Sequence, residues 1–181
     1  MTAQIHVVDD DPDFRDALSW LFDSRGHQVA TWPGGDVFLA MAQAMPPQWG
    51  LAVVLLDIRM APLSGLATFE QLKELACPWP VLFLTGHGDV SMAVTAVKNG
   101  AWDFLEKPFQ NNVLVDKVEQ ALVAAQSLVD ETADHQRLLG RLMAERAGVI
   151  RLEAEQSVLP APEWVGEVLD AVALLGPSAG R

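Results

Sequence analysis

The chain has 181 residues, half of them apolar, and 12 Lys and Arg against 24 Asp and Glu give a formal net charge of −12. The apolar share is sufficient for the core of a domain and excludes a disordered chain, while the negative charge disfavours direct contact with nucleic-acid phosphates. A single cysteine, Cys77, excludes an intrachain disulfide, and no apolar run reaches the roughly 18 residues that a membrane-spanning helix needs. We therefore expect a soluble, cytoplasmic, globular protein.

Short apolar runs alternate with helical patterns along the first two thirds of the chain. The apolar runs predict strands at Ile5–Val8, His27–Trp32, Leu51–Leu56, Val81–Leu84 and Trp102–Leu105. The helical patterns predict helices at Pro12–Arg25, Gly35–Ala44, Gly65–Leu75, Asp89–Asn99 and from Asn111 onward. This alternation indicates an α/β fold with a doubly wound parallel sheet, and the continuously apolar third strand is typical of a strand covered on both faces.

Polar residues follow four of the predicted strands. The first ends in three aspartates at 9–11, the third in Asp57, the fourth in Thr85, and the fifth runs into Lys107. Each has an ordinary interpretation, since Asp11 before a proline is typical of a helix cap, Thr85 with Gly86 of a turn, and lysines are commonly solvated. In a doubly wound sheet, however, ligands bind outside the carboxyl ends of the strands. Carboxylates gathered there are stabilised by a hard divalent cation, so their joint placement predicts a metal-dependent site.

Four short motifs at these strand ends resemble a known family. They are Val-Val-Asp-Asp at 7–10, Leu-Leu-Asp-Ile-Arg-Met at 55–60 with Ser-Gly at 64–65, Leu-Thr-Gly-His-Gly at 84–88, and Phe-Leu-Glu-Lys-Pro-Phe at 104–109. Residues 4–124 resemble the receiver domain of bacterial two-component response regulators, of the type often joined to a LuxR-type helix-turn-helix output domain. The resemblance implies a flavodoxin-like sheet of order 2-1-3-4-5 and a cis bond before Pro108. One departure is Ala61, which separates Met60 from Pro62.

The resemblance also implies roles for individual residues. Asp57 would accept a phosphoryl group from a sensor histidine kinase, and Asp9 and Asp10 would join it in holding Mg²⁺ or Mn²⁺, with the backbone carbonyl of Arg59 as a further ligand. Such a protein is a phosphoacceptor that assists its own phosphorylation and dephosphorylation rather than an enzyme. Phosphorylation would remodel the surface of the fourth helix, fifth strand and fifth helix, and so favour a homodimer.

The remaining implied roles belong to Thr85 and Lys107, which would contact the phosphoryl oxygens, and to Phe104, which would swing inward when Thr85 moves. The chemistry agrees, because Mg²⁺ and Lys107 would supply the positive charge that phosphoryl transfer needs. Gly86 and Gly88 would let the following loop approach without a Cβ in the way. Two alternatives stay open: a receiver-like interaction module that is never phosphorylated, and a haloacid-dehalogenase-type phosphatase using Asp9 as nucleophile.

The rest of the chain predicts a helical linker at 125–155 and a short amphipathic helix within 156–181, after a receiver domain at 1–124. Steps of four and three, typical of a coiled-coil seam, connect Leu114, Val118, Ala121, Ala125, Leu128, Thr132, His135, Leu139, Leu142, Arg146 and Val149. The polar positions leave open a receiver helix followed by a separate exposed helix, and His135 is either a polar surface residue or a phosphotransfer histidine. Residues 111–181 carry 6 Lys and Arg against 11 Asp and Glu, and we identify no complete output domain, so DNA contact would require one outside this chain.

Overall fold

The computed structural model describes residues 3–44, 50–86 and 88–156. The strands are β1 (Gln4–Val8), β2 (Gln28–Trp32), β3 (Ala52–Asp57), β4 (Val81–Thr85) and β5 (Asp103–Glu106). The helices are α1 (Pro12–Asp23), α2 (Gly35–Ala44), α3 (Gly65–Glu74), α4 (Val90–Lys98) and α5 (Asn111–Gln156). These elements confirm the predicted alternation and most of its boundaries. The short amphipathic helix predicted within 156–181 falls on residues that the structure does not describe.

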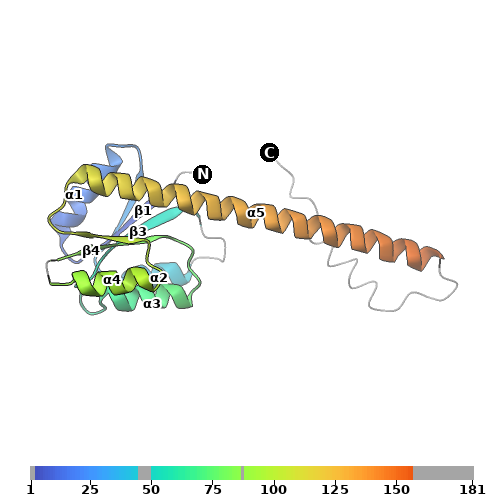
Figure 1. Cartoon of the computed structure of the whole chain (residues 1–181), viewed down its shortest axis with the longest axis horizontal. Coiled ribbons are helices and arrows are strands. Elements are labelled where there is room, and N and C mark those ends of the chain that lie inside the picture. The colour runs from blue at the N-terminus through green and yellow to red at the C-terminus, as the bar shows by residue number, and fades with distance from the viewer. Residues whose placement is uncertain (1–2, 45–49, 87, 157–181) are drawn as a thin grey trace. The chain divides into compact units, whose positions relative to one another are not determined.

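The chain divides into two compact units, Met1–Leu128 and Val129–Arg181. In the first unit all five strands are parallel and follow the order β2-β1-β3-β4-β5, as expected. Helices α1 and α5 cover one face of this sheet, and α2, α3 and α4 cover the other (Figure 1). Side chains alternate between the two faces, so Val53 and Leu55 of β3 join the core under α1 and α5, while Val54 and Leu56 join the core under α2–α4.

Two polar residues fix the helix starts that border the site. The Asp11 carboxylate accepts hydrogen bonds from the backbone N–H groups of Asp13 and Phe14, which confirms it as the N-cap of α1. Ser64 caps α3 in the same way through the N–H of Ala67. Each of these helices is therefore the element that follows a strand whose end carries a candidate site residue.

Strand register brings those ends to one level of the sheet. Val8 pairs with Leu56 and Asp57 pairs with Leu84, so Asp9 emerges beside Asp57. Thr85 pairs with Glu106, so Lys107 emerges at the same edge. The parallel sheet thus gathers residues that are up to 98 positions apart in the sequence.

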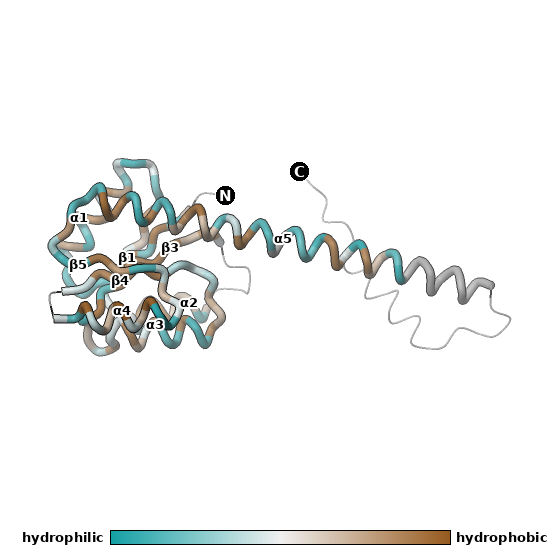
Figure 2. The backbone as a smooth tube through the Cα atoms, viewed as in Figure 1, coloured by the Kyte–Doolittle hydropathy of each residue, from teal (hydrophilic) through white to brown (hydrophobic). Residues whose placement is uncertain are grey.

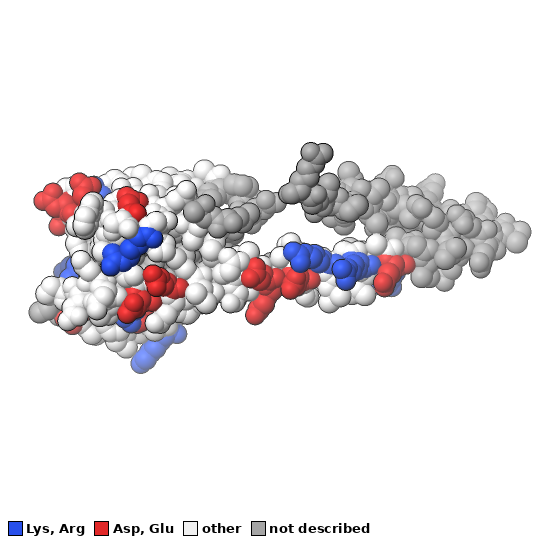
Figure 3. All heavy atoms as spheres, turned by 90° about the horizontal axis from the view of Figure 1, so that it is seen from above, with Lys and Arg blue, Asp and Glu red and all other residues white. Residues whose placement is uncertain are grey.

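Helix α5 is a single element, so the alternative of two separate helices is wrong. Its first part, 111–128, buries four of the predicted seam positions in the core of the first unit: Leu114, Val118, Ala121 and Ala125. In the second unit, by contrast, Leu138, Leu139, Leu142 and Met143 are exposed, and apolar residues recur along the helix (Figure 2). Acidic and basic side chains both lie along the part of α5 that is in view in Figure 3. The predicted seam positions therefore divide into a buried group in the first unit and an exposed group that includes Leu139 and Leu142.

Candidate functional site

Three charged side chains meet where β1, β3 and β5 end. The Lys107 ammonium donates hydrogen bonds to Asp9 Oδ2 at 2.7 Å and to Asp57 Oδ1 at 2.8 Å. Both carboxylates are buried, and the Lys107 side chain is 26% exposed. Because a buried carboxylate is destabilising unless it is paired, this ammonium is what allows two negative charges to share one edge of the sheet.

The charges of this cluster are not equally favoured. Burial raises the pKa of the Asp57 carboxyl and the charge of Asp9 adds to the rise, while the hydrogen bond and charge of Lys107 and the Arg59 N–H oppose it. Burial alone would lower the pKa of Lys107, but its hydrogen bonds with Asp57 and Asp9 and their charges outweigh burial and raise it. Lys107 is therefore a permanent cation, and the fold disfavours the charged form of Asp57.

The loop after β3 contributes a second contact to Asp57. The backbone N–H of Arg59 donates to Asp57 Oδ2 at 2.7 Å, so each oxygen of this carboxylate has a donor. The Arg59 side chain turns to Asp89 instead, with Nε 2.6 Å from Oδ2 and Nη2 2.7 Å from Oδ1. Sequence reasoning missed this ion pair, because nothing in the spacing of residues 59 and 89 indicates that their side chains meet.

Thr85 lies on the neighbouring strand end and is fully buried. Its hydroxyl donates to the Gly86 carbonyl at 3.0 Å, and that carbonyl also accepts the backbone N–H of Asp89 at 3.0 Å. Phe104, one strand further along the sheet, is half-buried against the core under α2–α4. The sheet thus places Thr85 and Phe104 on adjacent paired strands. Asp10, the other predicted metal ligand after β1, is exposed.

Comparison with known proteins identifies the family to which this fold belongs. The profile of the response regulator receiver domain matches residues 5–119. The chain belongs to the response regulator receiver family. The transcriptional regulatory protein FixJ of Bradyrhizobium diazoefficiens is 38% identical over 140 residues, which cover 77% of this chain and 66% of FixJ. The crystal structure of FixJ-N superposes with a TM-score of 0.60 at 35% identity, covering 67% of this chain and 94% of that one.

A second relative shows how much longer such regulators can be. The C4-dicarboxylate transport transcriptional regulatory protein DctD of Pseudomonas aeruginosa is 38% identical over 165 residues. The match covers 88% of this chain but only 35% of DctD. The chain thus spans between about a third and two thirds of the length of these two relatives.

The donors of this receiver suit a divalent cation in part. The carboxylates of Asp9 and Asp57 already converge on one positive charge, the Lys107 ammonium, and hard carboxylate oxygens are what Mg²⁺ prefers. Within residues 3–44, 50–86 and 88–156, however, no three His, Cys, Asp or Glu side chains gather as a metal site. The exposed carboxylate of Asp10 would have to turn toward the other two to complete the expected set.

The glycines near the receiver site differ in what they permit. A Cβ on Gly86 would meet nothing closer than Asp89 Oδ2 at 4.0 Å, and one on Gly88 nothing closer than Arg59 Nη2 at 3.6 Å, which are ordinary contacts. Both positions therefore have room for a Cβ among the protein atoms, and the role of these two glycines in the approach of the loop to a phosphoryl group stays a prediction. Gly65 is the constrained one, because a Cβ there would lie 2.0 Å from the Asp57 carbonyl oxygen. Sequence reasoning included Gly65 only as part of a motif.

Two peptide bonds beside the site are cis. The Lys107–Pro108 bond is cis, as the resemblance implied, and the Ala61–Pro62 bond after the departure from the family pattern is cis as well. Lys107 also places its ammonium 3.9 Å from the ring centroid of Phe14 on α1. An aromatic face so close to a cation adds attraction to its ion pairs.

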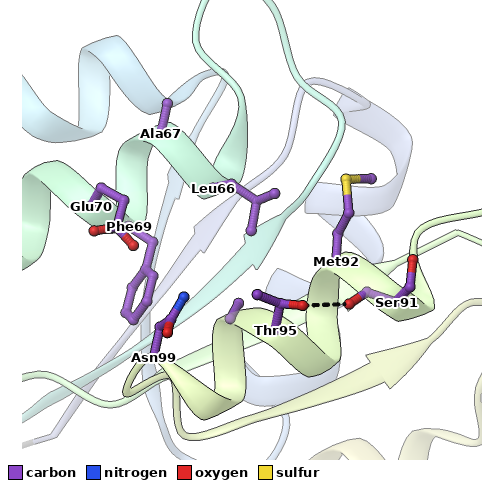
Figure 4. A pocket seen from close by; sticks show the side chains of 9 residues that line it. Leu66, Ala67, Phe69, Glu70, Ser91, Met92, Thr95 and Asn99 are labelled. Atoms are coloured by element: carbon purple, nitrogen blue, oxygen red, sulfur yellow. Dashed lines mark hydrogen bonds between the residues drawn. The ribbon is translucent and has the colours of Figure 1, made fainter.

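A groove between α3 and α4 lies apart from the carboxylates. It has a volume of about 460 Å³ and is lined by Leu66, Ala67, Phe69, Glu70, Ser91, Met92, Thr95, Ala96 and Asn99 (Figure 4). Its lining contains no residue of the charged cluster, so the groove is not part of the phosphoacceptor site.

In the described part of the chain, no helix is long and apolar enough to cross a membrane.

Proposed function

We propose that the chain accepts a phosphoryl group on Asp57 from a sensor histidine kinase. The observation that carries this proposal is the buried Asp57 carboxylate, held by the Lys107 ammonium and the Arg59 N–H at the end of β3 in a receiver fold. One carboxylate oxygen forms a bond to phosphorus, and the bond from phosphorus to the donor histidine nitrogen breaks with its electron pair staying on the imidazole. Lys107 neutralises charge on the transferring group throughout.

The metal in this proposal is Mg²⁺ or Mn²⁺, held by Asp9, Asp10, Asp57 and the backbone carbonyl of Arg59. When bound, it supplies positive charge to the phosphoryl oxygens and keeps Asp57 ionised. Burial disfavours the ionised form of Asp57, whereas the metal cation and the Lys107 ammonium both favour it. The chain turns over no separate substrate, and is in this sense a phosphoacceptor and not an enzyme.

The proposed switch begins at Thr85. Its hydroxyl leaves the Gly86 carbonyl for a phosphoryl oxygen, and Phe104 moves inward as the loop follows. The surface of α4, β5 and α5 changes with it, where Val94, Trp102 and Val113 are already exposed and the Lys117 ammonium pairs with Asp103. An apolar surface next to a movable element supports phosphorylation-dependent homodimerisation.

The second part of α5 supports a further contact in the dimer. Leu128, Leu139 and Leu142 keep the heptad spacing and are exposed, and Leu138 and Met143 widen their apolar face. We place the domain boundaries as receiver 1–124, helical linker 125–155 and tail 156–181. The protein acts in the cytoplasm and controls transcription, through DNA contacts made by an output domain.

Mass spectrometry after incubation with acetyl phosphate and Mg²⁺ tests the chemistry. We expect one labile phosphoryl group on Asp57, dependent on the metal and absent in Asp57→Asn. A group on Asp9 would favour the phosphatase alternative, and no group under these conditions would favour the unphosphorylated interaction module. Sedimentation of the same samples tests assembly: a dimer that tightens with the phosphoryl group is expected, and a strict monomer contradicts it.

A further inference from the structure

The ion pair between Arg59 and Asp89 occupies the carboxylate that would otherwise cap α4. Asp89 is the N-cap residue of α4, where an aspartate ordinarily accepts hydrogen bonds from the N–H groups of the first turn. Here both of its oxygens are bound by the guanidinium of Arg59, and α4 receives no side-chain cap. Asp89 is 2% exposed, so the pair is the contact that keeps this carboxylate satisfied inside the fold.

Arg59 is at the same time the closest basic neighbour of Asp57 along the chain. Its backbone N–H binds Asp57 Oδ2 at 2.7 Å, so its side chain begins beside the phosphoacceptor. Phosphorylation adds up to about two negative charges and three strong acceptor oxygens there, and the planar fork of arginine binds phosphate oxygens in pairs. The Arg59 side chain is 73% exposed, so it can rotate through solvent without displacing packed groups.

A second connection joins the phosphoacceptor to Asp89. The Gly86 carbonyl accepts both the Thr85 hydroxyl and the backbone N–H of Asp89. If Thr85 turns toward a phosphoryl group, this carbonyl loses one of its two donors, and the backbone at the start of α4 is held less tightly. Both connections therefore weaken in response to the same event.

We propose that Arg59 is a charge-exchange residue. While Asp57 is a carboxylate, the guanidinium holds Asp89; once Asp57 is phosphorylated, it transfers to the phosphoryl oxygens, and the released Asp89 caps the first turn of α4. The inference rests on the proposed role of Asp57. It also couples the site to the groove between α3 and α4 (Figure 4). Helix α3 follows the loop that contains Arg59, and α4 follows its N-cap residue Asp89.

Beryllofluoride with Mg²⁺, a mimic of the phosphoryl group, separates exchange from a static ion pair. We expect Arg59→Gln to weaken mimic binding about five-fold, because a phosphoryl ligand is lost, and Asp89→Asn to tighten it about five-fold, because the guanidinium no longer has to leave a partner. Arg59→Lys retains the charge without the fork and should fall between Arg59→Gln and the wild type. Binding is followed by the rise in Tm on titration with the mimic.

The matched control is the exposed ion pair of Glu70 and Lys73 on α3, whose Nζ–Oε2 distance is 3.0 Å. Glu70→Gln and Lys73→Gln should leave mimic binding at the wild-type value. Shifts in the same direction for Arg59→Gln and Asp89→Asn, or no shift for either, would overturn the exchange while Asp57 remains a phosphoacceptor. A wild-type chain that does not bind the mimic at all would overturn the exchange and the proposed function together.

Discussion

His6 lies in the middle of β1 and Asp9 directly follows this strand, and both are buried, yet their surroundings differ. The His6 ring packs among Trp32, Phe38 and Trp79, with its centroid 4.8 Å from that of Trp79, and burial lowers its pKa to about 4. Asp9 instead shares the Lys107 ammonium with Asp57. Two side chains buried to the same depth and three residues apart therefore have different surroundings, one aromatic and the other charged.

The difference follows from what surrounds each group. His6 Nδ1 accepts the indole N–H of Trp32 at 3.1 Å, and its buried Nε2 has no hydrogen-bond partner among the described residues. No carboxylate of the described residues pairs with this ring, so burial disfavours its positively charged form. The carboxylate cluster contains a cation that can share or exchange its partners. A buried neutral ring such as that of His6 belongs to a rigid core. Buried charged groups that are paired, such as those around Lys107, form a site in which the pairing can change.

The largest expected effect is acid sensitivity of the aromatic cluster. His6 takes up a proton below its usual pKa of 6.5 in the unfolded chain but only below about 4 in the fold. Stability from the neutral ring is thus complete above pH 6.5 and is lost as the pH falls toward 4, by up to roughly 3 kcal/mol. His6→Gln, which can still accept from Trp32, should remove this component from unfolding free energies measured by denaturant titration between pH 7 and 4.

His135, exposed on α5, supplies the control for that measurement. His135→Gln removes an imidazole without touching the cluster and should reproduce the wild-type profile. If His6→Gln loses stability with acid as steeply as the wild type, then the loss comes from carboxylates elsewhere, and the contrast between the two clusters disappears.

The sequence predicted the charged cluster and not the aromatic one for a physical reason. Asp9, Asp57, Thr85 and Lys107 stand at strand ends, and the topology of a parallel sheet alone brings such ends together. The partners of His6 come from β2, α2 and the segment before β4, and their meeting depends on how side chains fill the core. Arg59 and Asp89 were missed for the same reason, since their contact depends on rotamers in two loops.

The heptad pattern of α5 shows another limit. Its spacing continues without a break from Leu114 to Leu142, although the first positions pack on the chain's own sheet and the later ones are exposed. Because a core-facing stripe and a coiled-coil seam have nearly the same period, periodicity identifies an apolar face but not what covers it. Only the sheet topology decides that Leu114 and Val118 are internal.

A smaller effect is expected from removing the cation of the charged cluster. Lys107→Met leaves Asp9 and Asp57 buried without their shared ammonium and should lower the unfolding free energy at pH 7 by about 2 kcal/mol, less than for a fully buried pair because Lys107 is partly exposed. Added Mg²⁺ should restore more stability to this variant than it adds to the wild type. His6→Gln should gain from Mg²⁺ no more than the wild type; an equal gain in all three would show that the cation does not replace the ammonium.

The smallest effect concerns the phosphoacceptor itself. Burial raises the pKa of Asp57, so the charged form of this carboxyl lowers the stability of the fold. The protonated form contributes its full stabilisation below the usual pKa of 3.8, and this stabilisation is lost as the pH rises through the pKa of the folded state. Asp57→Asn removes the charge and keeps an acceptor for Lys107, so its Tm at pH 7 should exceed that of the wild type by about 2 °C. As the wild-type carboxyl becomes protonated in acid, the difference should shrink.

Calorimetry of both proteins from pH 7 to pH 4 measures this difference in Tm, with Asp134→Asn on the exposed face of α5 as the control. A lower Tm for Asp57→Asn at pH 7 would mean that the charge stabilises the fold, and the site would then resemble an ordinary structural ion pair more than a carboxylate kept charged for reaction.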